Sequence, residues 1–269
     1  MLEPKSNHLD IKMEAFFDFN GKKIKYSESG EGPAIVFLHG FLENRTMWNN
    51  FLNQFPHNRC ITIDLPGMGE SDMVGNVHSM ELMAQVIKDL LDHLNIEQTS
   101  IVGHSMGGYI SLAFAELFPN RVFKIIMLNS TFKADDEERK ETRNRAIAMM
   151  DDHPRAFISM AISNWATEES RENFKEAIEA LKTAAYNFPI DGIKAALMGM
   201  RDREERSRIL KDFPGKKYLL LGKEDPLIPA ASTAEEAEKL GVKTKIVSGG
   251  HLSPIENFPE VLEFLLETI

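Results

Sequence analysis

Short apolar runs of strand length alternate with amphipathic segments of helix length over most of the chain. A continuous apolar run such as residues 34–38 is typical of a strand that is covered on both faces. In residues 79–94 the apolar positions recur at helical spacing, at Leu82, Val86, Leu90 and Leu94. The same reasoning predicts strands over residues 60–64, 122–128, 216–221 and 242–247, and helices over residues 47–55, 109–115, 230–240 and 260–267. The alternation predicts an α/β fold, with a mostly parallel central sheet and helices on both faces.

The pattern departs from this alternation at two places. Residues 14–26 form two alternating segments that meet at Asn20-Gly21, which predicts a β-hairpin. After residue 131 the strand-like runs vanish, and charged helical segments take over at residues 135–151, 155–165, 168–187 and 190–201. Because the alternation then resumes, we interpret residues 132–212 as a helical insertion and residues 1–131 and 213–269 as the α/β core.

Composition excludes several classes of protein. A net charge of −10 disfavours nucleic-acid binding, which needs basic surface. No apolar stretch approaches the length that crosses a membrane, and the first eight residues lack the apolar core of a secretory signal. The single cysteine, Cys60, lies in a strand pattern, excludes an internal disulfide and suits a reducing compartment. We therefore expect a cytoplasmic protein in which Cys60 is a small core residue.

The strongest local motif is Gly103-His104-Ser105-Met106-Gly107. An apolar strand pattern precedes it and an alanine-bearing helix pattern follows it, so the chain turns sharply at Ser105. Such a turn strains the backbone of the serine and needs small residues two positions before and after it. The glycines meet that need, and the motif predicts an exposed serine hydroxyl with the N–H of Met106 free beside it.

A serine hydroxyl is a poor nucleophile at neutral pH and needs a base, which in turn needs an acid to orient it. Functional groups of such a sheet gather at the carboxyl ends of its strands. Two such ends follow in the chain, one offering Asp225 and the other His251. The spacing predicts a Ser105, Asp225, His251 triad, with Glu224 as an alternative acid.

The chain resembles a capped α/β-hydrolase over nearly its whole length. The resemblance rests on His39-Gly40, Asp64-x-Pro-Gly-x-Gly-x-Ser71, Gly103-x-Ser-x-Gly107 and the pair of Asp225 and His251. It implies that the acid directly precedes Pro226, which favours Asp225 over Glu224. It also implies that the backbone N–H of Phe41 acts beside that of Met106 in an oxyanion hole, and that residues 132–212 form a helical cap.

The substrate pocket is less readable. Met149, Phe157 and Trp165 either line an apolar acyl pocket or only pack the cap helices together. His39 is a further candidate near the pocket, although a role in bracing the oxyanion loop is favoured, and His104 is expected only to pack or hydrogen-bond locally. Four cations are interleaved with glutamates, which favours a solvated helix face over an anion site: Arg139, Lys140, Arg143 and Arg145.

These residues predict a serine hydrolase that acts through an acyl-enzyme, with a carboxylesterase on a small to medium acyl ester as the first expectation. Proteins that resemble this chain also include carbon–carbon bond hydrolases of ring cleavage and a lyase of menaquinone biosynthesis. The Gly103-x-Ser-x-Gly107 motif is shared by these enzymes and by esterases, so it does not distinguish between the reactions. A slow-turnover ligand sensor is a third possibility. The histidines show no metal-ligand spacing, and we expect no metal, no organic cofactor, a small-molecule acyl substrate and a monomer or homodimer.

Overall fold

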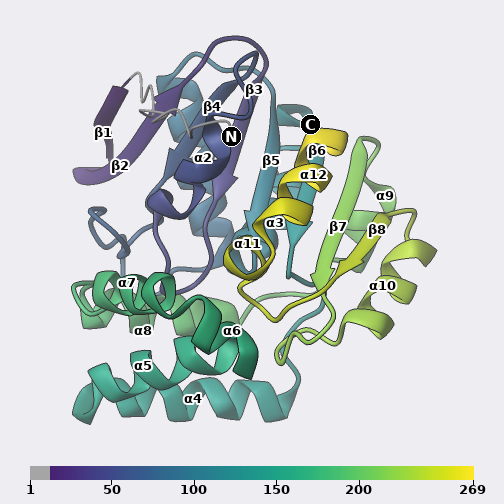
Figure 1. The fold of residues 1–269 in the computed structure, drawn as a ribbon. Coiled ribbons are helices and arrows are strands. Elements are labelled where there is room, and N and C mark those ends of the chain that lie inside the picture. Colours follow the sequence, from purple (N-terminus) through teal and green to yellow (C-terminus); the bar gives the residue numbers. More distant parts are fainter. Residues whose placement is uncertain (1–12) are drawn as a thin grey trace, which may run out of the picture.

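An eight-stranded sheet crosses the molecule in the computed structural model, which describes residues 13–269 (Figure 1). The strand order is β1-β2-β4-β3-β5-β6-β7-β8. The strands are β1 (Met13–Phe19), β2 (Lys22–Ser29), β3 (Ala34–Leu38), β4 (Arg59–Ile63), β5 (Thr99–His104), β6 (Val122–Leu128), β7 (Lys216–Gly222) and β8 (Lys243–Val247). Strands β1 and β2 pair antiparallel, β2 pairs antiparallel with β4, and every later pairing is parallel. The expected α/β fold is confirmed, whereas the expectation about a signal in the first eight residues lies outside the described range.

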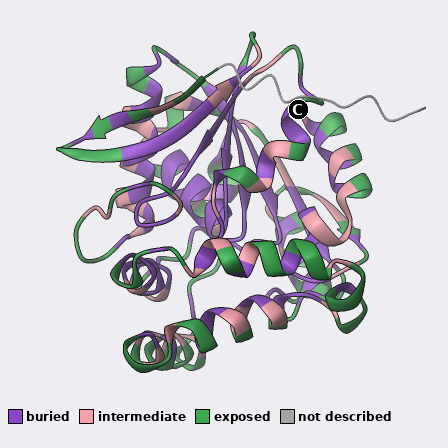
Figure 2. Cartoon of the chain, turned by 60° about the vertical axis from the view of Figure 1, so that its left-hand side comes forward, coloured by how far each residue is buried: buried purple, intermediate pink, exposed green. Residues whose placement is uncertain are grey.

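The apolar strands are buried because helices cover both faces of the sheet. Along β3, Val36 and Leu38 face the cluster that α2 (Met80–His93) and α3 (Met106–Leu117) complete, whereas Ile35 and Phe37 face the opposite cluster. That second cluster is completed by the 3-10 helix η1 (Arg45–Trp48), α1 (Asn49–Leu52) and α12 (Phe258–Thr268). Figure 2 shows the central strands buried, with exposed segments on the helices that surround them. A continuous apolar run is therefore what a strand between two layers requires.

Six helices follow β6 and precede β7. They are α4 (Glu137–Asp152), α5 (Pro154–Trp165), α6 (Glu168–Asn173), α7 (Lys175–Ala185), α8 (Ile190–Arg201) and α9 (Ser207–Asp212). Helices α4 to α8 lie together below the sheet in Figure 1. Helix α4 packs on α5 and α8, while α9 contacts α3 beside the sheet.

Several helix boundaries differ from the expectations. The helix expected over residues 47–55 is only the short η1 and α1, and the one expected over residues 168–187 is two helices separated at Phe174. Phe174 leaves the helical region (φ −116°, ψ 28°) and packs partly buried against the main apolar cluster, with no glycine or proline to mark the break. Three further helices have no counterpart among the expected ones: α9, α11 (Ser253–Glu256) and the 3-10 helix η2 (Pro119–Arg121). The helix expected over residues 230–240 is α10 (Ala230–Lys239).

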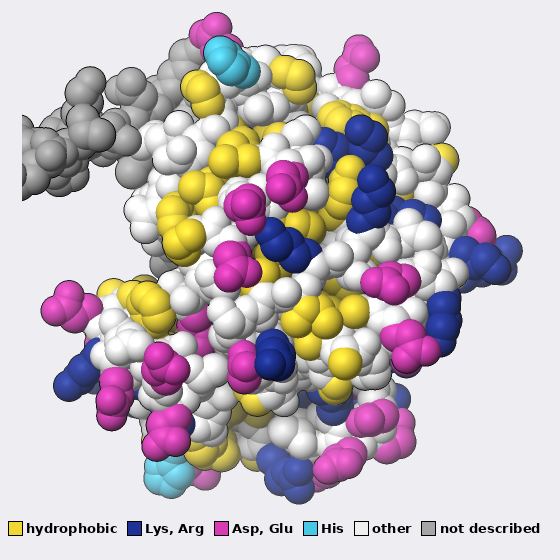
Figure 3. All heavy atoms as spheres, turned by 45° about the vertical axis from the view of Figure 1, so that its right-hand side comes forward, with side chains coloured by type: hydrophobic (Ala, Val, Ile, Leu, Met, Phe, Trp, Pro, Cys, Tyr) yellow, Lys and Arg dark blue, Asp and Glu magenta, His cyan; other side chains and the backbone are white. Residues whose placement is uncertain are grey.

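The outer surface mixes charges of both signs. On the face seen in Figure 3, Lys and Arg side chains are interspersed with Asp and Glu. This face lacks the concentrated positive charge that binds phosphate backbones. Within residues 13–269 no helix combines the length and the apolar character that crossing a bilayer requires.

Candidate active site

Ser105 occupies the sharp turn between β5 and α3. Its backbone has φ 49° and ψ −112°, a strained conformation that costs about 1–3 kcal/mol. A Cβ on Gly103 would lie 2.4 Å from the carbonyl of Gly107, and one on Gly107 would lie 2.5 Å from the backbone oxygen of Leu38. The Ser105 N–H donates to the oxygen of Leu128 at 2.9 Å, which ties the turn to β6. The two glycines and this hydrogen bond hold the serine hydroxyl at the carboxyl edge of the sheet.

The structure brings Ser105, His251 and Asp225 together as the sequence predicts. His251 Nε2 lies 2.8 Å from Ser105 Oγ, and His251 Nδ1 lies 2.8 Å from Asp225 Oδ2. The other carboxylate oxygen of Asp225 accepts hydrogen bonds from the N–H groups of Leu227 and Ile228. Burial alone would raise the pKa of Asp225, but the neighbouring His251 and these hydrogen bonds lower it overall. The acid therefore stays ionised and can orient the imidazole.

Asn129 completes this arrangement, and the sequence analysis missed it. Its Nδ2 donates to Asp225 Oδ2 at 3.0 Å and to the carbonyl of Gly250 at 3.0 Å, while its Oδ1 accepts from the Ser253 hydroxyl. The residue directly follows β6 and has φ 47°, a conformation that asparagine tolerates well. Its place at the carboxyl end of a predicted strand was the available signal.

The two predicted oxyanion donors are the backbone N–H groups of Phe41, which lines the same cavity as Ser105, and of Met106, which directly follows Ser105. Neither the N–H of Phe41 nor that of Met106 has a hydrogen-bond acceptor within residues 13–269. Met106 is the first residue of α3, where backbone N–H groups lack partners inside the helix and the dipole favours negative charge. Phe41 follows Gly40, whose N–H is held by Glu43 Oε2 at 2.5 Å. These free N–H groups suit an oxyanion, although their role stays a prediction.

Glu43 and His104 form a buried ion pair under the site. His104 Nδ1 lies 2.9 Å from Glu43 Oε2, and its Nε2 lies 2.9 Å from the backbone oxygen of His251. The backbone oxygen and an ionised Glu43 carboxylate can only accept hydrogen bonds, so with Glu43 ionised both ring nitrogens donate and His104 is an imidazolium. Burial alone would lower the pKa of His104, but the Glu43 carboxylate raises it overall. Burial would likewise raise the pKa of Glu43, and the His104 charge lowers it.

His39 behaves in the opposite way. Its Nδ1 lies 2.7 Å from the oxygen of Gly40, while its Nε2 accepts from the N–H of Leu65 at 2.9 Å. A ring that donates once and accepts once is neutral, and burial lowers the pKa of His39 accordingly. His39 thus braces the loop that carries Phe41, which is the role that the sequence favoured.

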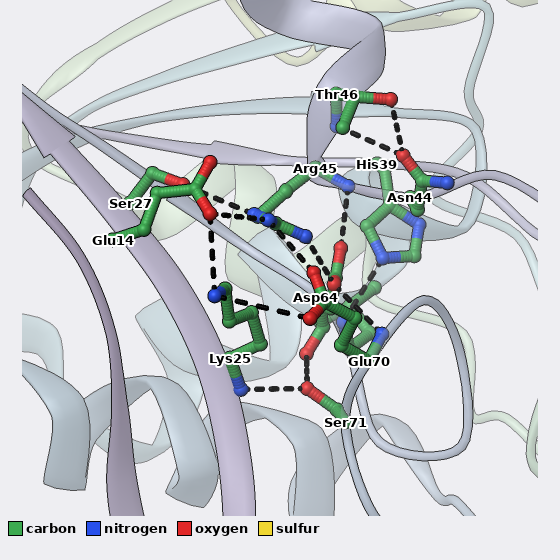
Figure 4. Close-up of polar contacts among 11 residues, drawn as sticks. Glu14, Lys25, Ser27, His39, Asn44, Arg45, Thr46, Asp64, Glu70 and Ser71 are labelled. Atoms are coloured by element: carbon green, nitrogen blue, oxygen red, sulfur yellow. Dashed lines mark hydrogen bonds and ion pairs between the residues drawn. The ribbon is translucent and has the colours of Figure 1, made fainter. Parts of the chain in front are cut away.

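A second buried network fixes the neighbouring loop after β4 (Figure 4). The Arg45 guanidinium and backbone N–H both bind the Asp64 carboxylate at 2.7 Å. The Ser71 hydroxyl donates to the backbone oxygen of Asp64 at 2.6 Å and accepts from the backbone N–H of Lys25 at 2.9 Å. Burial would lower the pKa of Arg45, but Asp64, Glu14 and Glu70 raise it overall. Asp64 and Ser71 therefore stabilise this loop.

A cavity of about 250 Å³ opens beside the serine, between the sheet edge and the helices after β6. Its wall includes Ser105, His251 and Phe41, and also the predicted Phe157 and Trp165. The Trp165 ring lies 6.0 Å from the His251 ring and 6.3 Å from the Phe41 ring, and its backbone oxygen accepts from the His251 N–H. Trp165 therefore contacts both His251 and Phe41.

Two of the pocket candidates lie elsewhere. His39 is fully buried behind the oxyanion loop, and Met149 packs half-buried against the main apolar cluster, so neither lines the cavity. Met200, a further methionine of the predicted cap, does line it. Arg139 and Arg143 also line it, so the expectation of a solvated helix face is wrong for these two.

The described residues offer neither a metal-binding cluster nor a reactive thiol. Among residues 13–269 no group of three or more His, Cys, Asp or Glu side chains is placed to hold a metal ion. Cys60 is buried in β4, and burial raises the pKa of its thiol to about 12, so it is protonated at neutral pH.

Comparison with known proteins identifies the same architecture. A family model described as alpha/beta hydrolase fold matches residues 33–258. A thermophilic esterase from Thermogutta terrifontis, solved with malate bound, superposes with a TM-score of 0.85, at 27% identity over 95% of this chain and 96% of that one.

Curated relatives match shorter segments. A 2-hydroxy-6-oxononadienedioate/2-hydroxy-6-oxononatrienedioate hydrolase from Paraburkholderia phymatum is 37% identical over 113 residues, which are 39% of this chain and 39% of that protein. A putative 2-succinyl-6-hydroxy-2,4-cyclohexadiene-1-carboxylate synthase from Bacillus subtilis is 30% identical over 147 residues, 51% of this chain and 54% of that one. The matches span between 34% and 54% of the length of such relatives.

Proposed function

The chain belongs to the alpha/beta hydrolase fold family, and on that premise we propose that it is a serine hydrolase that cleaves carboxylic esters through an acyl-enzyme. One observation carries the proposal. The imidazole of His251 lies 2.8 Å from both Ser105 Oγ and Asp225 Oδ2, at the wall of a cavity that a small acyl compound fits. The likeness to the Thermogutta terrifontis esterase, which extends over 95% of this chain, supports the same reaction.

The acylation step follows from this geometry. Ser105 Oγ attacks the ester carbonyl while His251 Nε2 takes the hydroxyl proton, and Asp225 stabilises the resulting imidazolium. The tetrahedral intermediate collapses when His251 returns the proton to the departing alcohol oxygen. An acyl group is then bound to Ser105, and the alcohol leaves.

Deacylation repeats the sequence with water. His251 takes a proton from a water molecule that attacks the acyl carbonyl, and then protonates Ser105 Oγ as the acid leaves. In both halves the negative oxygen faces the free N–H groups of Phe41 and Met106. Each such donor typically lowers the barrier by about 3 kcal/mol.

The helices after β6 serve, in this proposal, as the cap that selects the substrate. Residues 132–212 supply Phe157, Ala161, Trp165, Leu197 and Met200 to the cavity wall. These side chains are mostly apolar and face the triad, which suits an acyl chain of small to medium length.

A ladder of 4-nitrophenyl esters, from acetate to long acyl chains, tests the proposal. We expect rapid turnover that peaks at one chain length and is abolished by Ser105→Ala, with the exposed Ser232→Ala as the matched control. A serine-directed phosphonate should label the wild type and not Ser105→Ala. Turnover that persists in Ser105→Ala, or the absence of labelling, would defeat the mechanism.

A second candidate is carbon–carbon bond hydrolysis. The similarity to the Paraburkholderia phymatum hydrolase over 113 residues favours it, because that relative is named for a 2-hydroxy-6-oxo diacid substrate. Loss of the absorbance of a 2-hydroxy-6-oxo-2,4-dienoate measures this reaction directly. Phosphonate labelling together with dienoate turnover and poor ester turnover would favour this candidate over the esterase.

A further inference from the structure

Helix α4 presents a polar stripe to the cavity. Arg139, Thr142, Arg143 and Ala146 all line it, and their spacing places them on one face of the helix. The same cavity is lined by the aromatic side chains of Phe41, Phe157 and Trp165. Two guanidinium groups thus border a space that is otherwise mostly apolar.

The guanidinium groups of Arg139 and Arg143 each make one hydrogen bond within the protein and have further N–H donors without a partner in the described part of the chain. Arg139 donates through Nη2 to the backbone oxygen of Leu227, which follows the triad acid in the same loop. Arg143 donates through Nε to Asp135 Oδ2 at 2.5 Å. Their other guanidinium N–H groups have no acceptor within the described part of the chain. The contacts therefore orient both side chains and leave their remaining N–H groups available to a ligand.

The charges around the stripe leave an excess of positive charge. Asp135 is fully buried and pairs with Arg143 and also with Arg203, whose Nη1 lies 2.7 Å from Oδ1. One carboxylate is thus shared by two guanidinium groups, and Arg139 has no acidic partner in the described chain. Among the described residues Glu43 is the only carboxylate that lines the cavity, and it is already paired with His104.

The remaining ionisable side chains of α4 do not alter this balance. Lys140 pairs with Glu137 at 2.8 Å, and Asp151 pairs with Lys194 at 2.6 Å. The others are exposed and do not line the cavity: Glu138, Glu141, Arg145 and Asp152. Over the whole chain the net charge is −10, so the positive stripe is a local feature and not a general property of the surface.

We propose that Arg139 and Arg143 form an anion subsite, and that the substrate is an ester carrying a carboxylate at some distance from the scissile carbonyl. A guanidinium fork matches the two oxygens of a carboxylate, and the apolar wall strengthens the interaction by excluding water. The proposal rests on the proposed function of Ser105, and it narrows the substrate to short anionic esters.

Matched pairs of esters test the subsite. 4-Nitrophenyl hydrogen adipate is compared with 4-nitrophenyl hexanoate, and 4-acetoxybenzoate with its methyl ester, so that the carboxylate sits on the acyl or on the alcohol part. In Arg139→Met and Arg143→Met the ratio of kcat/KM for the charged over the neutral ester should fall about tenfold to a hundredfold, mainly through KM. Arg145→Met, on the exposed side of α4, is the control and should keep the wild-type ratio.

A binding measurement separates this inference from the esterase proposal. Adipate should raise the midpoint of thermal unfolding of the Ser105→Ala protein, adipamide should not, and Arg139→Met introduced into that background should abolish the effect. Adipate stabilisation without ester turnover would retain the subsite and reject the esterase. Equal losses on charged and neutral esters in both arginine variants, or no stabilisation by adipate, would overturn the subsite and leave only a structural role for the stripe.

Discussion

The imidazolium of His104 is held between the Glu43 carboxylate and the backbone oxygen of His251, at 2.9 Å from each. Glu43 also holds the N–H of Gly40, next to the predicted oxyanion donor Phe41. One buried ion pair therefore connects the loop that carries Phe41, the predicted oxyanion donor, with His251, the proposed base. Because both side chains are almost fully buried, the pair is not weakened by solvent, and its loss leaves an uncompensated charge.

Glu43→Gln should impair both stability and turnover. Removing one partner of a buried pair typically costs about 3–5 kcal/mol of unfolding free energy, and displacement of His251 should lower kcat more than it changes KM. Urea unfolding and ester kinetics measure the two effects. Glu224→Gln, at an exposed position beside the triad acid, is the control. Wild-type stability in Glu43→Gln would show that the pair contributes nothing.

The same pair predicts a pH window. The pKa of His104 is raised, so its contribution to stability is complete below its ordinary value of 6.5 and is lost as the pH rises through the raised value. The pKa of Glu43 is lowered, so its contribution is complete above 4.5 and is lost as the pH falls through the lowered value. The difference in unfolding free energy between the wild type and Glu43→Gln should thus be largest between these limits and shrink on either side. A difference independent of pH would contradict the assignment of charges.

Asn129 should act on the rate through Asp225. Asn129→Gly keeps the backbone conformation but removes the donor to Asp225 Oδ2, and we expect kcat to fall about tenfold with KM little changed. Asn129→Asp should be worse, because it places a second carboxylate about 3 Å from the first. Asn95→Gly is the control, since Asn95 also has a positive φ (54°) but lies at the end of α2. Equal kcat in Asn129→Gly and the wild type would exclude this positioning role.

The sequence predicted the triad because its signals are local. The glycines around Ser105, the proline after Asp225 and the strand ends before Asp225 and His251 are each read within a few residues. Glu43 and His104 are 61 residues apart, and Asn129 and Asp225 are 96 apart, so their pairing depends on the strand order. A single glutamate, histidine or asparagine in the sequence does not indicate which distant residue it pairs with once the sheet has formed.

The side of helix α4 that faces the cavity could not be predicted from the sequence. Helix α4 is polar almost throughout, so no broad apolar face indicates which side meets the cavity. The stripe through Arg139, Arg143 and Ala146 continues to Met150, which is fully buried, and not to its neighbour Met149. Successive residues of a helix point about 100° apart, so an error of one position exchanges a buried side chain for a half-buried one.

Neutralising each of the two candidate acids separately tests whether Asp225 or Glu224 orients the histidine, the one alternative that the sequence left open within the triad. Asp225 Oδ2 binds His251 Nδ1 and is buried, whereas Glu224 is exposed and its Oε2 accepts from the N–H of Gly249. Asp225→Asn should retain the fold and lower kcat about 10⁴-fold, because the amide favours the wrong tautomer of the histidine. Glu224→Gln should retain most of the activity. Circular dichroism and phosphonate labelling of both variants establish that the fold and the serine are intact. A larger loss in Glu224→Gln than in Asp225→Asn would assign the acid to Glu224 and require a different arrangement of the loop in solution.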